Sequence, residues 1–230
     1  MKKINIFLAG DSTMADYPAA ESPQTGWGQL LPLFLKSEAV VHNKAANGRS
    51  SKSFIEEGRL DDIKKQIAKN DYLLVQFGHN DSKPEESRRT KPFSTYQEYL
   101  NQYIKAAEQK GAHPLLLTPI QRRRFNSNGQ ILQTHGKYPD AMRQLAEELD
   151  VPLIDLTKIT DDYLKSLGFE SSKSFFMWLA PGQSTNFPDG VQDDTHLNEE
   201  GAKAVARLAA EEISNFSFPL AHYINKEVLK

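Results

Sequence analysis

Near its amino terminus the chain reads INIFLAGDST at positions 4–13. Six mostly apolar residues, Ile4–Ala9, run directly into Gly10, Asp11 and Ser12, which are residue types that turns prefer. A short apolar run that ends in turn residues is typical of a buried strand. We therefore expect a first β-strand over Ile4–Ala9, with the hydroxyl of Ser12 facing solvent at the turn that follows.

The same alternation continues along the whole chain, with short apolar runs separated by longer segments of helical period. Further strands are predicted at Ala39–His42, Tyr72–Phe77, Pro114–Thr118 and Pro152–Ile154. Helices are predicted at Gly26–Lys36, Ser53–Lys69, Ser94–Lys110, Tyr138–Asp150, Leu156–Leu167 and Glu199–Asn215. This pattern indicates an α/β fold, in which helices cover a central parallel sheet of about five strands. Two stretches, Lys83–Phe93 and Phe169–Asp194, are expected to be long irregular loops.

Composition excludes several classes of protein. Hydrophobic residues make up 39% of the 230 residues and charged residues 25%, which is typical of a globular protein. We see no internal repeat and no linker, so one domain over residues 1–230 is expected. The formal net charge of −2 gives no general attraction to nucleic acid or to an anionic membrane. The absence of cysteine excludes disulfides, a thiolate nucleophile and cysteine metal ligands.

Location is predicted from the first residues and from the apolar runs. Two lysines precede Ile4–Ala9, but six residues are too few for a signal peptide, and no run approaches the ~18 residues of a membrane span. We therefore expect a cytoplasmic protein. Its oligomeric state is not indicated.

Polar residues follow three of the predicted strands. Ser12 follows the first, Gly48 lies in NGRSS after the second, and Asn80 lies in GHND after the third. The carboxyl ends of parallel strands form the usual ligand-binding edge of an open sheet. A hydroxyl there is a possible nucleophile, and a glycine N–H or an asparagine amide can stabilise an oxyanion. Taken singly, each segment is equally compatible with an ordinary turn or helix cap.

A fourth polar segment, DDTHLN at positions 193–198, precedes the last helix. An aspartate three residues before a histidine in a turn can accept the Nδ1–H of the imidazole, which leaves Nε2 free to take a proton from a serine. The alternative is a plain helix start, in which Asn198 is the N-cap and His196 is a loop residue.

Together these four segments resemble the SGNH (GDSL-like) hydrolase superfamily, and they occur in the family's order. The resemblance implies a three-layer α/β/α sandwich of flavodoxin-like type, with Ser12 as nucleophile and His196 with Asp193 as its base pair. It also implies an oxyanion hole formed by the Ser12 and Gly48 backbone N–H groups and the Asn80 amide. Of the two adjacent aspartates, Asp193 is chosen because the family pattern is Asp-x-x-His.

Within that superfamily the chain is similar to the rhamnogalacturonan acetylesterases, through GDSTM, GWG, NGRSS, GHND, TP and DDTHLN. This resemblance implies removal of acetyl groups from pectic oligosaccharides without a cofactor or a metal. Another acetylated carbohydrate such as xylan, or a small acyl ester, is the alternative substrate.

Several further residues are candidates for substrate binding. Trp27 and Trp178 are candidates for stacking on sugar rings, and His79 lies beside Asn80 on the expected edge. Arg122, Arg123 and Arg124 follow the fourth strand and carry the fork that binds a carboxylate; of these, Arg123 is our choice. Each has an ordinary alternative, since a tryptophan is often a core residue and a basic loop is often merely solvated.

Two other functions remain open. His79, Asn80, Asp81, Asp193, Asp194 and His196 are potential metal ligands, which would suit a metallophosphoesterase, although no early Asp-x-His pair is present. A sugar-binding module that has lost its chemistry is the third possibility, and the complete set of five catalytic and oxyanion residues argues against it.

Overall fold

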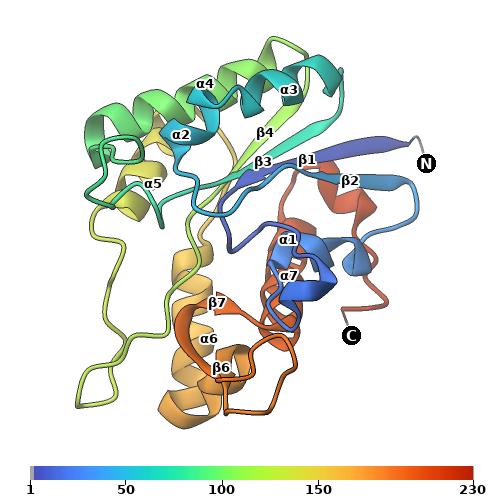
Figure 1. The fold of residues 1–230 in the computed structure, drawn as a ribbon. Helices are drawn as coiled ribbons and strands as arrows, with labels where there is room; N and C mark the ends of the chain where they lie inside the picture. Colours follow the sequence, from blue (N-terminus) through green and yellow to red (C-terminus); the bar gives the residue numbers. More distant parts are fainter. Residues whose placement is uncertain (1–2, 230) are drawn as a thin grey trace.

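A five-stranded parallel sheet forms the centre of the fold. The computed structural model describes residues 3–229. The sheet order is β2-β1-β3-β4-β5 (Figure 1). Its strands are β1 (Ile4–Gly10), β2 (Ala39–Asn43), β3 (Tyr72–Gln76), β4 (His113–Leu117) and β5 (Leu153–Ile154). The five predicted strands are thus confirmed, each to within one residue at either end.

Helices cover both faces of this sheet. They are α1 (Trp27–Leu30), α2 (Ser51–Glu56), α3 (Arg59–Gln66), α4 (Gln97–Glu108), α5 (Tyr138–Glu148), α6 (Leu156–Ser171) and α7 (Glu199–Asn215). Successive strand residues point to opposite faces. Accordingly, Ile6 and Leu8 pack with apolar residues of α1, α6 and α7, whereas Phe7 and Ala9 pack with those of α2 to α5. The three-layer α/β/α sandwich is therefore confirmed (Figure 1).

Two predicted helices are broken in the structure. The segment expected as one helix over residues 53–69 is divided into α2 and α3 at Gly58, whose φ of +76° does not fit a right-handed helix. The segment expected at residues 26–36 contains only the four residues of α1, followed by a 3₁₀ turn at Leu31–Phe34 that contains Pro32. By contrast, α7 has the bounds that its pattern predicted.

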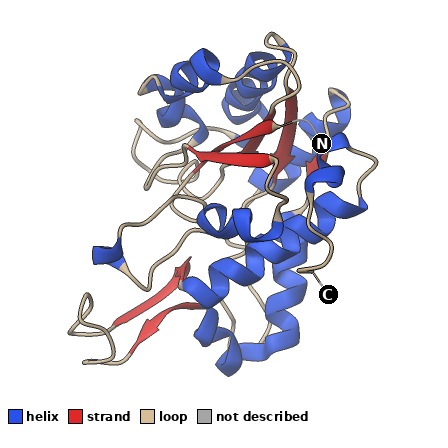
Figure 2. Ribbon diagram, turned by 90° about the vertical axis from the view of Figure 1, so that its right-hand side faces the viewer, coloured by secondary structure: helices blue, strands red, loops and turns tan. Residues whose placement is uncertain are grey.

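The expected loop at residues 169–194 is in large part structured. Gly168, with a φ of +77°, kinks α6, and residues 169–171 form a further helical turn after it. An antiparallel hairpin follows, formed by β6 (Phe176–Leu179) and β7 (Val191–Leu197). Figure 2 shows this hairpin apart from the central sheet. Its pairing jumps from Met177–Asp193 to Phe176–Leu197, so residues 194–196 bulge out of the ladder. The bulge interrupts the alternation of a strand, which is why the pattern predicted a turn.

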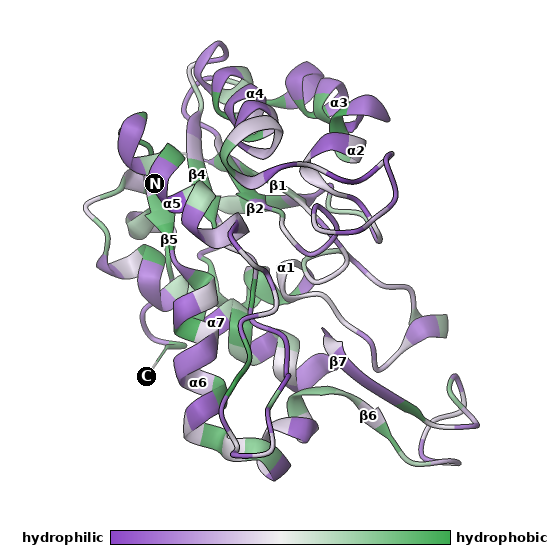
Figure 3. Cartoon of the chain, turned by 90° about the vertical axis from the view of Figure 1, so that its left-hand side faces the viewer, coloured by the Kyte–Doolittle hydropathy of each residue, from purple (hydrophilic) through white to green (hydrophobic). Residues whose placement is uncertain are grey.

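The helices carry apolar residues on the side that faces the sheet. Helix α7 buries Ala202, Val205, Ala206, Ala209 and Ile213, while its charged residues lie elsewhere around the helix. Figure 3 shows the resulting mixture of apolar and polar segments along α6 and α7. Within residues 3–229, no helix is both long enough and apolar enough to cross a membrane.

Candidate active site

Ser12 lies at the carboxyl end of β1, two residues after Gly10. The N–H groups of Met14 and Ala15 both donate to the carbonyl of Asp11 at 3.1 Å, so the chain makes a helical turn directly around the serine. The hydroxyl of Tyr17 donates to the Ser12 carbonyl at 2.9 Å. Only 8% of Ser12 is exposed. The serine is thus held in a tight turn rather than in a loose loop.

The GWG segment explains how this turn is fixed. A Cβ atom on Gly26 would lie 2.1 Å from the carbonyl oxygen of Ala15, and one on Gly28 would lie 2.5 Å from that of Met14. The backbone of α1 therefore packs directly on the backbone of the serine turn. Any side chain at Gly26 or Gly28 would push this turn out of position.

Ser12, His196 and Asp193 form a continuous chain of hydrogen bonds. Nε2 of His196 lies 3.0 Å from Oγ of Ser12, and Nδ1 lies 2.7 Å from Oδ2 of Asp193. Oδ1 of Asp193 accepts the backbone N–H groups of Thr195 and His196 at 2.6 and 3.0 Å. Burial raises the pKa of Asp193, but the contacts with His196 and these N–H groups outweigh it, so the pKa falls to about 2. The carboxylate is therefore ionised at neutral pH.

The bulge in β7 brings these side chains together. In a regular strand, residues three apart point to opposite faces. Here the chain curls around the Asp193 carboxylate, which allows His196 to reach it. The N–H of Thr25 donates to the carbonyl of Leu197 at 3.0 Å, and Gln24 bridges to Asn198. The histidine segment is thus attached to the loop that follows the serine.

The predicted oxyanion residues come from the loops after β2 and β3. Gly48 has a φ of +78°, a conformation that favours glycine. The Asn80 amide nitrogen donates to the carbonyl of Arg49 at 3.0 Å, which joins the two loops. Its second N–H has no acceptor within residues 3–229.

Two buried carboxyls, Asp11 and Asp81, support these loops, a role that the sequence analysis did not predict for either residue. Oδ1 of Asp11 accepts the N–H and hydroxyl of Thr13 at 3.0 and 2.8 Å. Oδ1 of Asp81 accepts the hydroxyls of Ser51 and Thr90 at 2.5 and 3.1 Å. Burial raises the pKa of Asp11 to about 6 and that of Asp81 to about 7. Neither carboxyl contacts the serine hydroxyl.

Trp27 does not have the position that a sugar-stacking residue needs, which corrects that prediction. Its side chain is fully buried, and Nε1 donates to Oε1 of Gln76 at 2.9 Å. The Gln76 amide in turn donates to the Thr13 hydroxyl at 2.8 Å. Trp27 therefore packs beneath the serine turn, in the apolar cluster that contains Leu8.

Arg123 is likewise buried, which corrects its assignment to the substrate. Only 2% of it is exposed, and its guanidinium donates to Ser172, to the carbonyl of Phe169 and to Asp194. The same group lies over the rings of Phe125, Phe169 and Trp178. Three of its N–H groups already have acceptors in the protein, and its burial keeps the guanidinium away from a substrate.

The other two binding candidates differ from each other in exposure. His79 is 3% exposed, and both of its ring nitrogens lack a partner within residues 3–229. Burial and the nearby His135 and Arg122 hold its pKa well below the ordinary value, so the ring is neutral. Trp178 is partly exposed, and its Nε1 donates to Asp194 at 2.9 Å. A binding role for either residue stays a prediction.

The possible metal ligands do not converge. In the part of the chain that the structure describes, no three histidine, aspartate or glutamate side chains come together as a cation site.

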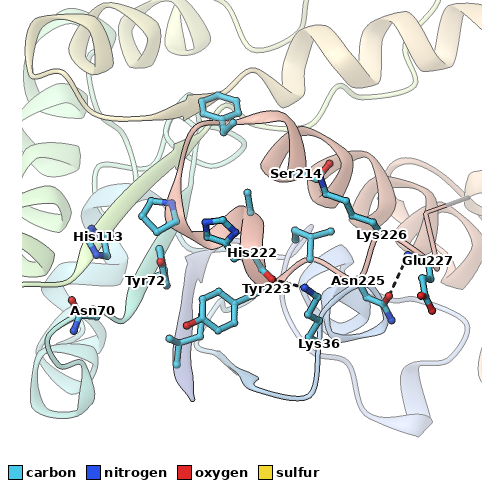
Figure 4. A pocket seen from close by; sticks show the side chains of 15 residues that line it. Lys36, Asn70, Tyr72, His113, Ser214, His222, Tyr223, Asn225, Lys226 and Glu227 are labelled. Atoms are coloured by element: carbon cyan, nitrogen blue, oxygen red, sulfur yellow. Dashed lines mark hydrogen bonds between the residues drawn. The ribbon is translucent and has the colours of Figure 1, made fainter. Parts of the chain in front are cut away.

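A cavity of about 1120 Å³ lies at the other end of the sheet, lined by Ile4, Tyr72 and His113 at the amino ends of their strands and by the last turns of the chain (Figure 4). It is distinct from the site around Ser12.

The chain is similar in sequence to known proteins over almost its whole length. The chain is 49% identical over 227 residues to the rhamnogalacturonan acetylesterase RhgT of Bacillus subtilis, covering 98% of this chain and 97% of that protein. It is 42% identical to the probable rhamnogalacturonan acetylesterase YesY of the same organism, with 97% and 98% covered.

A solved structure shares the fold. The crystal structure of YxiM from Bacillus subtilis superposes with a TM-score of 0.79 at 32% identity, covering 93% of this chain and 57% of that chain. Residues 6–209 match the family described as GDSL-like Lipase/Acylhydrolase. The protein is therefore a member of the GDSL-like lipase/acylhydrolase family.

Proposed function

We propose that this protein is a serine acetylesterase that removes acetyl groups from rhamnogalacturonan oligosaccharides. The observation that carries the chemistry is the hydrogen-bonded chain from Ser12 through His196 to Asp193. The substrate is supported by the full-length similarity to RhgT and YesY.

The reaction begins with attack of Ser12 Oγ on the acetyl carbonyl carbon, while Nε2 of His196 takes the hydroxyl proton. The Asp193 carboxylate accepts Nδ1–H, which sets the tautomer and stabilises the imidazolium that forms. The carbonyl oxygen becomes an oxyanion, and the backbone N–H groups of Ser12 and Gly48 and the amide of Asn80 donate to it.

Collapse of this intermediate breaks the bond between the acyl carbon and the sugar oxygen. His196 gives its proton to the departing sugar alkoxide and leaves an acetyl ester on Ser12. Water then attacks the ester, giving up a proton to His196. This attack forms a second tetrahedral intermediate. When that intermediate collapses, the bond between the acyl carbon and Ser12 Oγ breaks, acetate leaves, and His196 returns the proton to Ser12. No metal or redox group takes part in this sequence.

The experiment compares acetate release from three substrates at matched ester concentration: acetylated rhamnogalacturonan oligosaccharides, acetylated xylo-oligosaccharides and a C8 4-nitrophenyl ester. The Ser12→Ala variant is the blank, because it loses only one oxygen at the serine turn. We expect the pectic substrate to give the highest kcat/KM. A preference of about tenfold or more for xylan or the C8 ester would overturn the substrate, whereas turnover by Ser12→Ala would overturn the mechanism.

A further inference from the structure

Three consecutive arginines follow β4, and they differ in whether a carboxylate lies beside the guanidinium. Arg123 is buried and pairs with Asp194 at 2.9 Å. Arg124 is exposed and lies 3.3 Å from the other oxygen of the same carboxylate. Arg122 is partly exposed and has no carboxylate within 4 Å in the described part of the chain.

The partners of Arg122 are neutral. Its Nη1 donates to the carbonyl and the hydroxyl of Thr134, each at 3.2 Å, and its Nη2 donates to the carbonyl of His79 at 3.1 Å. A guanidinium has five N–H donors, so Nε–H and one Nη2–H remain without an acceptor among residues 3–229. Nε and Nη2 lie on one edge of the planar group, and a carboxylate binds to that edge with both oxygens.

Arg122 is also close to the proposed reaction centre. The carbonyl that it holds belongs to His79, the residue before Asn80. Its charge lowers the pKa of Asp11, the neighbour of Ser12, and that of His79. Burial lowers the pKa of Arg122 itself, and the charges of Asp11 and Asp193 oppose this effect only in part. A partly buried cation without an ion-pair partner is costly, and an anionic ligand relieves that cost.

We propose that Arg122 is the specificity-determining residue of this site, binding the carboxylate of a uronic acid in the substrate through Nε–H and Nη2–H. This inference rests on the proposed function and makes it more specific. The enzyme then selects an acetylated sugar that is itself a uronate, or is directly linked to one, over a neutral sugar with the same acetyl group.

The first test changes the substrate and leaves the protein intact. Acetylated pectic oligosaccharides are compared with the same oligosaccharides after reduction of their uronate carboxyls to neutral alcohols. We expect kcat/KM of the wild type to fall roughly 10- to 100-fold on reduction, the range for losing hydrogen bonds to a charged group. Equal values for the two substrates would overturn the inference, even where the enzyme still prefers pectic sugars to xylan.

The second test changes the arginine. In Arg122→Gln the ratio of kcat/KM between the acidic and the reduced substrate is expected to fall to near one, whatever the loss of absolute rate. Arg122→Lys keeps the positive charge but cannot donate two parallel hydrogen bonds to a carboxylate. We expect its ratio to lie between those of Arg122→Gln and wild type. Arg124→Gln is the matched control and should keep the wild-type ratio. A ratio that persists in Arg122→Gln would assign the selectivity to another residue.

A binding readout separates this inference from the proposed function. Deacetylated galacturonate-containing oligosaccharides are used as inhibitors of 4-nitrophenyl acetate hydrolysis, so no pectic acetyl ester needs to be cleaved. We expect the inhibition constant of these oligosaccharides to be roughly 10- to 100-fold lower for wild type than for Arg122→Gln. Equal inhibition of the two proteins would contradict the role of Arg122. Failure of wild type to prefer acetylated pectic substrates would contradict the proposed function instead.

Discussion

Oγ of Ser12 lies 3.0 Å from Nε2 of His196, although 184 residues separate the two along the chain. The contact depends on two separate attachments. The serine turn rests on the backbone of Gly26 and Gly28, and the N–H of Thr25 donates to the carbonyl of Leu197 at 3.0 Å. A single short segment, residues 24–28, thus positions both ends of the hydrogen-bonded pair.

Asp193 and Asp194 are adjacent in sequence but face different partners. Asp193 accepts Nδ1–H of His196, whereas Asp194 accepts from the buried Arg123 and from Nε1 of Trp178. We expect Asp193→Asn to lower kcat by up to ~10⁴, because the amide favours the wrong imidazole tautomer.

Asp194→Asn is the matched variant, and we expect it to lower stability rather than kcat. It leaves a buried guanidinium without its anion, which typically costs about 3 kcal/mol of unfolding free energy. Esterase rates and urea denaturation of both variants check the pair. The assignment fails if Asp194→Asn loses more activity per folded molecule than Asp193→Asn does.

The amide of Asn80 is expected to act mainly in the transition state. One N–H donates to the carbonyl of Arg49, which orients the group, and the other has no acceptor among residues 3–229 and is the donor proposed for the oxyanion. Asn80→Ala should therefore lower kcat by roughly 10² to 10³ with a smaller change in KM. Steady-state kinetics with 4-nitrophenyl acetate measure both constants. An increase confined to KM would make Asn80 a substrate-positioning residue.

The central sheet could be predicted from the sequence because each strand is a short apolar run that ends in turn residues. The same reasoning failed for residues 176–197, where the bulge at residues 194–196 breaks the alternation of β7. Motifs predicted which residues meet at the edge of the sheet, but not which side chains are buried there. The indole of Trp27 and the guanidinium of Arg123 are both groups that can bind a sugar acid. Only the structure reveals that both side chains are buried and that their N–H groups donate to Gln76 and Asp194 instead.

His135 makes the fold sensitive to acid. Burial lowers its pKa from 6.5 to about 3, so the folded protein keeps it neutral over a range in which the unfolded chain takes up a proton. The unfolded state then binds more protons than the folded state. The contribution of His135 to the free energy of unfolding is therefore complete above pH 6.5 and is lost progressively as the pH falls toward 3.

His135→Phe isolates this contribution because phenylalanine cannot be protonated. The variant loses the hydrogen bond from Nε2 to the carbonyl of Ile120, a cost that does not depend on pH. We expect the stability advantage of wild type over the variant to shrink by about 3 kcal/mol between neutral pH and about pH 4. Urea denaturation across that range measures the difference. Parallel curves for the two proteins would show that His135 is protonated in the fold.

Gly26 and Gly48 lie beside the same site, but they require glycine for different reasons. Gly26 has an ordinary φ of −87°, and what excludes a side chain is the Ala15 backbone, 2.1 Å from the position of a Cβ. Gly48 has a φ of +78°, and nothing lies within 4 Å of its Cβ position.

Substitution by alanine should therefore separate the two. Gly48→Ala should cost about 1 to 2 kcal/mol for a side chain in the left-handed region and keep its N–H in place. Gly26→Ala must displace the turn that carries Ser12, and a misplacement of about 1 Å typically costs ~10² in rate. Thermal unfolding and 4-nitrophenyl acetate hydrolysis of both variants provide the comparison. If Gly26→Ala keeps wild-type kcat while Gly48→Ala loses it, the serine turn does not depend on its contact with α1.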